Sequence, residues 1–167
     1  MKREEQCSNC GRMAHVRRSD YRFDEMGLPV VLQRIEVVTC QYCGNVDPII
    51  PNINDLMHAL ALAVICDPCK LNGDEFRFLR KYVGKSGEEF GKLLHLGKTH
   101  VCKIETGATP IGDQTDKLVR FLVLHLSPEL RAKADQFMKL LPDISDDCAN
   151  LKQEVHIDPD TMQYCYA

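Results

Sequence analysis

At 167 residues the chain is long enough for one medium domain or two small ones, and a segment of some fifty residues rarely builds a sufficient core alone. A net charge of −3 argues against a protein coated in basic residues. The amino terminus is charged rather than apolar, and the longest apolar stretch, residues 56–65, is too short to cross a bilayer. Nine cysteines, an odd number, fit a reducing compartment better than a disulfide framework. We therefore expect a cytoplasmic protein without a membrane role.

Two Cys-x-x-Cys-Gly motifs, Cys7–Cys10 and Cys40–Cys43, have the spacing with which paired thiolates hold a tetrahedral metal. Glycine suits the position after each pair, where the chain turns back at positive φ. The sequence predicts one structural Zn²⁺ per chain bound by these four cysteines. The alternative is a set of buried or redox-active thiols.

Between the motifs, residues 15–23 and 30–38 are rich in β-branched and aromatic residues and predict a hairpin. Strict alternation places Val31, Ile35 and Val37 on one face and Arg34, Glu36 and Val38 on the other. Together with the cysteines this predicts a zinc-ribbon domain over residues 1–50.

A linker over residues 51–72 follows, with an apolar helix expected at 54–65. It ends near a third cysteine pair, Cys66 and Cys69. That pair suggests a second metal or a thioredoxin-like site, but it follows a helix and contains a proline, so a linker turn is the favoured interpretation.

Residues 73–126 predict four short helices, at 74–82, from Ser86, at 98–105 and at 115–126. Ser86 with Glu89 forms a capping-box pattern. A fifth helix beginning at Pro128 opens a C-terminal helix and tail over residues 127–167, where Leu151, Val155 and Ile157 hint at a strand. The aromatic end, residues 164–166, could dock on a partner.

Basic charge is concentrated in the middle of the chain. Residues 76–103 hold seven lysines and arginines against two glutamates, a local charge of +5. Two short helices with a tight glycine-containing turn and a basic second helix describe a helix-turn-helix, whose second helix enters the major groove. We find no acid pair, activated nucleophile or phosphate-cradling loop, so the sequence does not predict an enzyme.

The stretch from Ser86 to Gly107 resembles the XRE-type (Cro/C1-type) helix-turn-helix. The resemblance rests on Phe90, Leu96, Val101 and Ile104 at apolar sites, Gly91 at the small contact site, and Glu105 with Gly107 at the end. The whole order of residues 7–126 resembles zinc-finger and helix-turn-helix antitoxins of the MqsA/YgiT type. This similarity implies a homodimer that binds an operator in double-stranded DNA, and a toxin held by the zinc domain. By motif position it implies DNA contacts at Lys98, Thr99, His100 and Lys103, with Lys85 and Lys92 nearby.

The sequence thus predicts an α+β protein with a small N-terminal zinc ribbon, an all-α helix-turn-helix domain and a C-terminal helical extension. The expected function is a DNA-binding repressor, a zinc-containing type II antitoxin that autoregulates its operon. The alternative is a protein-interaction adaptor without DNA binding, favoured by Gly87 and Gly97, which replace a common glutamine and a serine or threonine cap. A third hypothesis is a thiol redox protein using Cys66 and Cys69.

Overall fold

The computed structural model describes residues 3–132, 137–139 and 154–166. The chain divides into two compact units. The first, which we call the sheet unit, comprises residues 1–24, 29–59 and 154–167; the second, the helical unit, comprises residues 25–28 and 60–153. The α+β class predicted from the sequence is confirmed.

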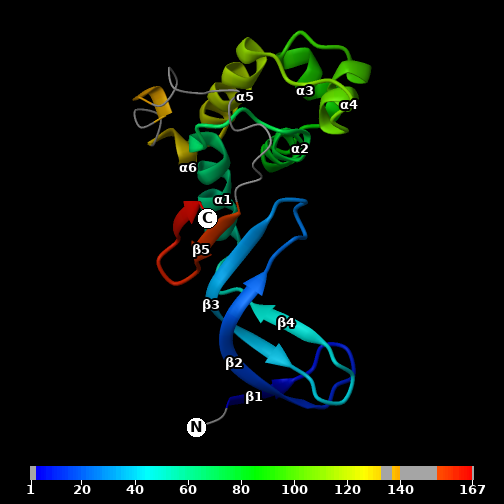
Figure 1. The fold of residues 1–167 in the computed structure, drawn as a ribbon, viewed down its shortest axis with the longest axis vertical. Helices are drawn as coiled ribbons and strands as arrows, with labels where there is room; N and C mark the ends of the chain where they lie inside the picture. Colours follow the sequence, from blue (N-terminus) through cyan, green and yellow to red (C-terminus); the bar gives the residue numbers. More distant parts are fainter. Residues whose placement is uncertain (1–2, 133–136, 140–153, 167) are drawn as a thin grey trace. The chain divides into compact units, whose positions relative to one another are not determined.

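The sheet unit contains six strands, four from the start of the chain and two from its end (Figure 1). They are β1 (Arg3–Gln6), β2 (Met13–Arg22), β3 (Val30–Thr39), β4 (Val46–Ile49), β5 (Val155–Asp158) and β6 (Gln163–Tyr166). The order is β1-β2-β3-β5-β6, and β4 also pairs with β3. All pairings are antiparallel except that of β3 with β5.

The sheet corrects two expectations. It has six strands where the sequence predicted a two-stranded hairpin, and the C-terminal region supplies strands as well as helix. The predicted strand at Val155 and Ile157 is confirmed as β5, whereas Leu151 lies outside the described residues. The aromatic end, residues 164–166, pairs within the sheet as β6.

A bulge in β3 changes which residues face the core. Its pairing with β2 shifts between Ser19 and Tyr21, and Arg34 adopts a φ of 53°. The extra residue reverses the phase of alternation at that point. Before the bulge, the buried residues of β3 are Val30 and Leu32. Val31, which was predicted to share the buried face of Ile35 and Val37, is only half-buried. The predicted strict alternation was therefore wrong for the part of β3 before the bulge.

Six helices are described between β4 and β5 along the chain (Figure 1). They are α1 (Ile53–Cys66), α2 (Gly73–Tyr82), α3 (Gly87–Leu93), α4 (Lys98–Glu105), α5 (Asp113–Leu126) and α6 (Pro128–Arg131). The capping box of Ser86 with Glu89 is confirmed, and Asn72 forms a second one with Glu75 at the start of α2. The fifth helix expected from Pro128 begins there as α6, and residues 133–136 and 140–153, which follow it, lie outside the described residues.

Close backbone contact fixes the turn between α3 and α4. His95 takes a φ of 54° after the end of α3, and the Leu96 N–H donates to the Gly91 carbonyl at 2.8 Å. A Cβ at Gly91 would lie 2.5 Å from the Leu96 carbonyl oxygen, so only glycine fits there without a shift. Beneath this turn Phe76 and Phe90 pack edge to face, with ring centroids 5.5 Å apart.

A buried ion pair holds the segment after α1. Arg120 and Asp116 of α5 are fully buried, and Arg120 Nε donates to Asp116 Oδ2 at 3.0 Å. The Arg120 guanidinium also donates to the carbonyl oxygens of Ile65 at 2.9 Å and Cys69 at 2.5 Å, and to that of Asp67. Arg120 therefore satisfies the carbonyl groups left open at the end of α1. Among the described residues, no helix is long and apolar enough to cross a membrane.

Candidate metal centre and candidate nucleic-acid interface

The two Cys-x-x-Cys-Gly turns, residues 7–11 and 40–44, have nearly identical backbones. The Gly11 N–H donates to the Cys7 carbonyl at 2.9 Å, and the Gly44 N–H donates to the Cys40 carbonyl at 3.0 Å. The two glycines have φ values of 72° and 74°, in the region that other residues enter only at a cost. In both turns the first cysteine's N–H also donates to the carbonyl five residues later, at 2.9 Å.

The four predicted cysteine ligands come together in one cluster, with sulfur atoms that all lie within 4.8 Å of one another. Cys7 Sγ is 3.5 Å from Cys43 Sγ, and Cys10 Sγ is 3.6 Å from Cys40 Sγ. Tetrahedral zinc with Zn–S bonds of about 2.3 Å would place its sulfur ligands about 3.8 Å apart. The cluster has the size and donor atoms to hold a metal ion, and it is the one such group within residues 3–132, 137–139 and 154–166.

Backbone amides stabilise the thiolate form of the first cysteine in each turn. The N–H of Cys10 lowers the pKa of Cys7, and the N–H of Cys43 lowers the pKa of Cys40 to about 6. The hydrogen bond from the Arg12 amide lowers the pKa of Cys10, but loss of solvation and the neighbouring sulfurs together outweigh it and raise that pKa to about 11. A cation would favour ionisation of all four.

Contacts between the turns organise the cluster. Asn45 Nδ2, just after the second turn, donates to Ser8 Oγ at 3.1 Å and to Asp47 Oδ2 at 2.6 Å, and Ser8 also donates to Asp47. The Arg12 guanidinium lies 4.7 Å from the centre of the Tyr42 ring, a cation–π distance. The first cysteine of each turn is buried with a few apolar residues: Ala14, Val38, Val16 and Ile49.

The predicted DNA-contacting residues lie mainly on α4. Val101 and Ile104 are buried, whereas Lys98, Thr99 and Lys103 are exposed. Helical spacing puts Thr99 and Lys103 opposite the buried pair, with Lys98 and His100 on the flanks. Gly97 caps α4 without a side-chain hydrogen bond, so no side chain takes the first-turn amides at this end.

Two residues that the sequence analysis did not single out share this face. Cys102 and Thr106 are exposed, three and seven positions after Thr99, and Thr106 Oγ1 donates to the Cys102 carbonyl at 2.9 Å. The signal was available in the spacing of i, i+3, i+4 and i+7, which places them on one side of a helix with Thr99 and Lys103.

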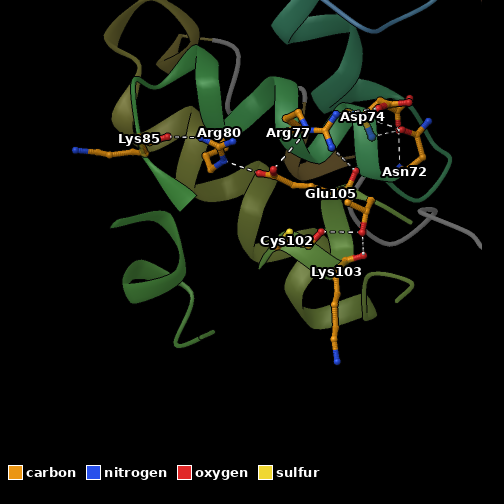
Figure 2. Close-up of polar contacts among 10 residues, drawn as sticks. Asn72, Asp74, Arg77, Arg80, Lys85, Cys102, Lys103 and Glu105 are labelled. Carbon is orange, nitrogen blue, oxygen red and sulfur yellow. Dashed lines mark hydrogen bonds and ion pairs between the residues drawn. The ribbon is translucent and has the colours of Figure 1, made fainter. Parts of the chain in front are cut away.

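Three of the seven basic residues in the middle of the chain, Arg77, Arg80 and Lys92, are paired with acids. Arg80 Nε lies 2.5 Å from Glu105 Oε1, and Arg77 Nε lies 3.4 Å from Glu105 Oε2 while Arg77 Nη2 donates to the Glu105 carbonyl at 2.8 Å. Figure 2 shows both arginines of α2 converging on the end of α4. Because Glu105 lies just beyond the window counted in the sequence, the local charge of +5 overstates the basic charge that is free.

The predicted lysine contacts differ in how available they are. Lys92 lies 2.8 Å from Glu88, which raises the Lys92 pKa. In the described residues, Lys85, Lys98 and Lys103 have no ion-pair partner. Figure 2 shows the side chains of Lys85 and Lys103 extending away from the arginine–glutamate contacts in different directions.

The third cysteine pair lies at and after the end of α1. Cys66 and Cys69 are 6% and 7% exposed, and the segment between them is hydrogen-bonded to Arg120. Cys69 is disulfide-bonded, whereas Cys66 carries a thiol, so the two do not form a disulfide with each other or a dithiol pair for exchange. The disulfide at Cys69 also corrects the expectation that the cysteines do not form disulfides.

No protein-family model, no curated protein and no solved structure matches this chain.

Proposed function

We propose that this chain is a zinc-containing transcriptional repressor that binds operator DNA through α4 and represses its own operon as the antitoxin of a toxin–antitoxin pair. The observation that carries the DNA step is the exposed face of α4, which presents Thr99 and Lys103 opposite a buried apolar stripe. The α3–α4 pair then acts as the helix-turn-helix, with α4 as the recognition helix.

The chemistry of α4 suits DNA. Lys98 and Lys103 can pair with phosphate oxygens or with guanine edges, and the Thr99 hydroxyl and methyl groups can contact a base edge. The first-turn amides, uncapped by Gly97, can donate to a phosphate. Lys92 and the two arginines of α2 contribute less, because acids neutralise them.

In the proposed protein the cysteine cluster holds one structural Zn²⁺ as a zinc ribbon. Four thiolates fill the coordination sphere, so the ion would stabilise the fold rather than act as a catalyst. The toxin is proposed to bind the N-terminal zinc domain, residues 1–50, a step that rests on the antitoxin resemblance.

Two recognition helices are needed for a two-half-site operator, so a homodimer belongs to the proposal. Its support is the apolar surface of α5, where Leu118, Phe121 and Leu126 are 44%, 54% and 38% exposed. A second copy of this helix could cover these side chains.

A gel-shift titration with the DNA upstream of the chain's own gene tests the proposal. We expect specific binding that weakens steeply with salt, and a loss of about 5- to 10-fold in affinity for Lys103→Ala, with the slope against log[salt] reduced by about 1. Lys92→Ala is the matched control and should lose less, because Glu88 already neutralises Lys92. Binding that ignores both salt and Lys103→Ala would overturn the DNA assignment.

The second candidate function is a protein-interaction adaptor. It is supported by the glycines at positions 87 and 97 and by the engagement of Arg77 and Arg80 with Glu105. The same gel shift separates the two candidates, since an adaptor gives no specific retardation at any salt concentration.

A further inference from the structure

One edge of β3 is divided between two strands. Residues 36–39 of β3 pair with β4, the next strand of the chain, whereas residues 30–32 pair with β5 from the C-terminal region. The β5 pairing is parallel and covers three residues, compared with seven residue pairs between β2 and β3. The Val155 N–H adds a hydrogen bond to the Pro29 carbonyl at 2.9 Å. The first part of β3 therefore accepts an extended segment in the manner of strand addition.

Two alternate residues anchor that segment. Val155 and Ile157 are 6% and 0% exposed, and their β3 partners Val30 and Leu32 are fully buried. His156, between the anchors, is half-buried, with Nδ1 3.1 Å from Gln33 Nε2. The spacing of two between anchors is that of an extended strand laid on a buried face.

Three arginines of β2 and β3 meet three acids of the segment. Arg34 Nη2 lies 2.7 Å from Asp158 Oδ2, Arg18 Nη1 lies 2.9 Å from Asp160 Oδ2, and Arg22 Nη1 lies 3.3 Å from Glu154 Oε1. The bulge at Arg34 helps to set this arrangement, since its N–H donates to Asp20 Oδ1 at 2.9 Å. The ion pairs thus match an acidic segment in one register.

These ion pairs contribute more to the specificity for an acidic segment than to the affinity for it. The side chains of Arg18, Arg22 and Arg34 are 57%, 62% and 74% exposed. Exposed ion pairs contribute little to affinity and weaken with salt. β5 also pairs with β6 over four residues, so β5 and β6 form a hairpin that, among the described strands, is joined to the others only through the three residue pairs and two anchors on β3. Such a hairpin can leave while β1, β2, β3 and β4 remain paired.

We propose that the first part of the β3 edge, residues 30–34 with Arg18 and Arg22, is a binding site for an extended acidic segment of a partner protein. The chain's own residues 154–160 are its intramolecular occupant and display the pattern it takes: an acid, two β-branched residues separated by one position, then two acids separated by a proline. The partner segment replaces residues 154–160. This goes beyond the proposed function and requires neither DNA nor an assigned metal.

Peptide titration of the full chain tests the site. The probe is a fluorescein-labelled peptide of residues 154–166 with Cys165→Ser, and the acceptors are the unmodified chain and the full-length Ile157→Asp variant, whose own segment loses an anchor. We expect Ile157→Asp to bind the peptide at least about tenfold more tightly, because a tethered segment competes at an effective concentration in the millimolar range. Equal affinity for both chains overturns the proposal, and the circular dichroism of the variant checks that its helices are retained.

A charge exchange tests the register. A peptide with Asp158→Arg should bind Ile157→Asp at least about fivefold more weakly, and an acceptor that also carries Arg34→Asp should restore it. If affinity is lost and Arg34→Asp does not restore it, Arg34 does not recognise the residue at position 158, and the assigned recognition pattern is overturned.

Hydrogen exchange of the unmodified chain tests the site even if Ile157→Asp fails to fold. Amides of residues 155–157 should exchange at least about tenfold faster than those of residues 36–38, and faster still in high salt. Equal protection means that the segment does not leave on its own, and it overturns the proposal. A failed gel shift leaves these outcomes unchanged, so the two proposals fail separately.

Discussion

The two units of this molecule are stabilised by different kinds of interaction. In the sheet unit, the apolar cluster near the cysteines is small, and the arginine–acid pairs that join β2 and β3 to the C-terminal strands are exposed. In the helical unit, Phe76, Leu79 and Phe90 are fully buried and an ion pair lies inside the core. We therefore expect the first unit to depend on a metal held by its four cysteines, and the second on packing and on one buried cation.

The largest effect is expected from Cys40→Ser. Replacing one thiolate removes a ligand from a cluster that we propose to hold Zn²⁺, and apparent zinc-binding free energies in small domains are about 10–16 kcal/mol. We expect the variant to lose its metal and residues 3–50 to lose their dispersed amide NMR signals, while helical circular dichroism persists. Metal content per chain is the direct measurement.

Cys165→Ser is the control, because Cys165 is an exposed cysteine of β6 outside the cluster. It should keep its metal and its spectrum. A Cys40→Ser protein that keeps one tightly bound ion per chain would show that the ligand set is wrong.

The next effect is expected in the helical unit, from Arg120→Met. The change leaves Asp116 buried without its cation and leaves carbonyl groups at the end of α1 without donors. Breaking a buried pair in this way costs about 3–5 kcal/mol. Urea unfolding followed by helical circular dichroism should report that loss, and the metal content of the sheet unit should not change.

Gln114→Ala, at an exposed position near the start of α5, should change the unfolding free energy by less than about 0.5 kcal/mol. If Arg120→Met were as mild as this control, packing alone would hold the helical unit.

Local signals predicted most of the elements. The capping box at Ser86 fixed the start of α3, and the spacing of Val101 and Ile104 fixed the buried side of α4. The cysteine cluster followed from motif spacing, because a tight turn with glycine positions both sulfurs without help from distant residues. Each of these signals lies within a few residues of the feature it predicts.

The features that were missed depend on distant contacts. Nothing near Val30 indicates that Val155 from the other end of the chain pairs beside it, and nothing near Arg34 indicates a bulge at a residue other than glycine. Asp116 and Arg120 have the spacing of an ordinary surface pair, and only the fold shows that both are buried. Glu105 likewise neutralises arginines that a local charge count treats as free.

The smallest expected effect is on how the unfolding free energy of each unit depends on pH. Burial raises the pKa of Glu75 to about 7, against an ordinary value of 4.5; the Asn72 amide and Arg120 oppose the rise, and Asp67 and Asp116 add to it. A raised pKa means that the folded state binds the proton more tightly, so the unfolding free energy of the helical unit falls as pH rises from about 5 to 7. Glu75→Gln keeps an oxygen for the Asn72 N–H and removes the charge. It should flatten this dependence and stabilise the helical unit by about 1–3 kcal/mol at pH 8.

The opposite sign is expected in the sheet unit. The amide of Asp160, together with Arg34, lowers the pKa of Asp158, so its contribution is present above the ordinary carboxyl range and is lost as pH falls below it. Asp158→Asn should therefore reduce the acid sensitivity of β5 protection in hydrogen exchange and leave the unfolding of the helices unchanged at pH 8. If Glu75→Gln and Asp158→Asn shifted the same pH-dependent unfolding transition in the same direction, the two units would unfold together. The two units would then differ in the residues that stabilise them but not in their stability.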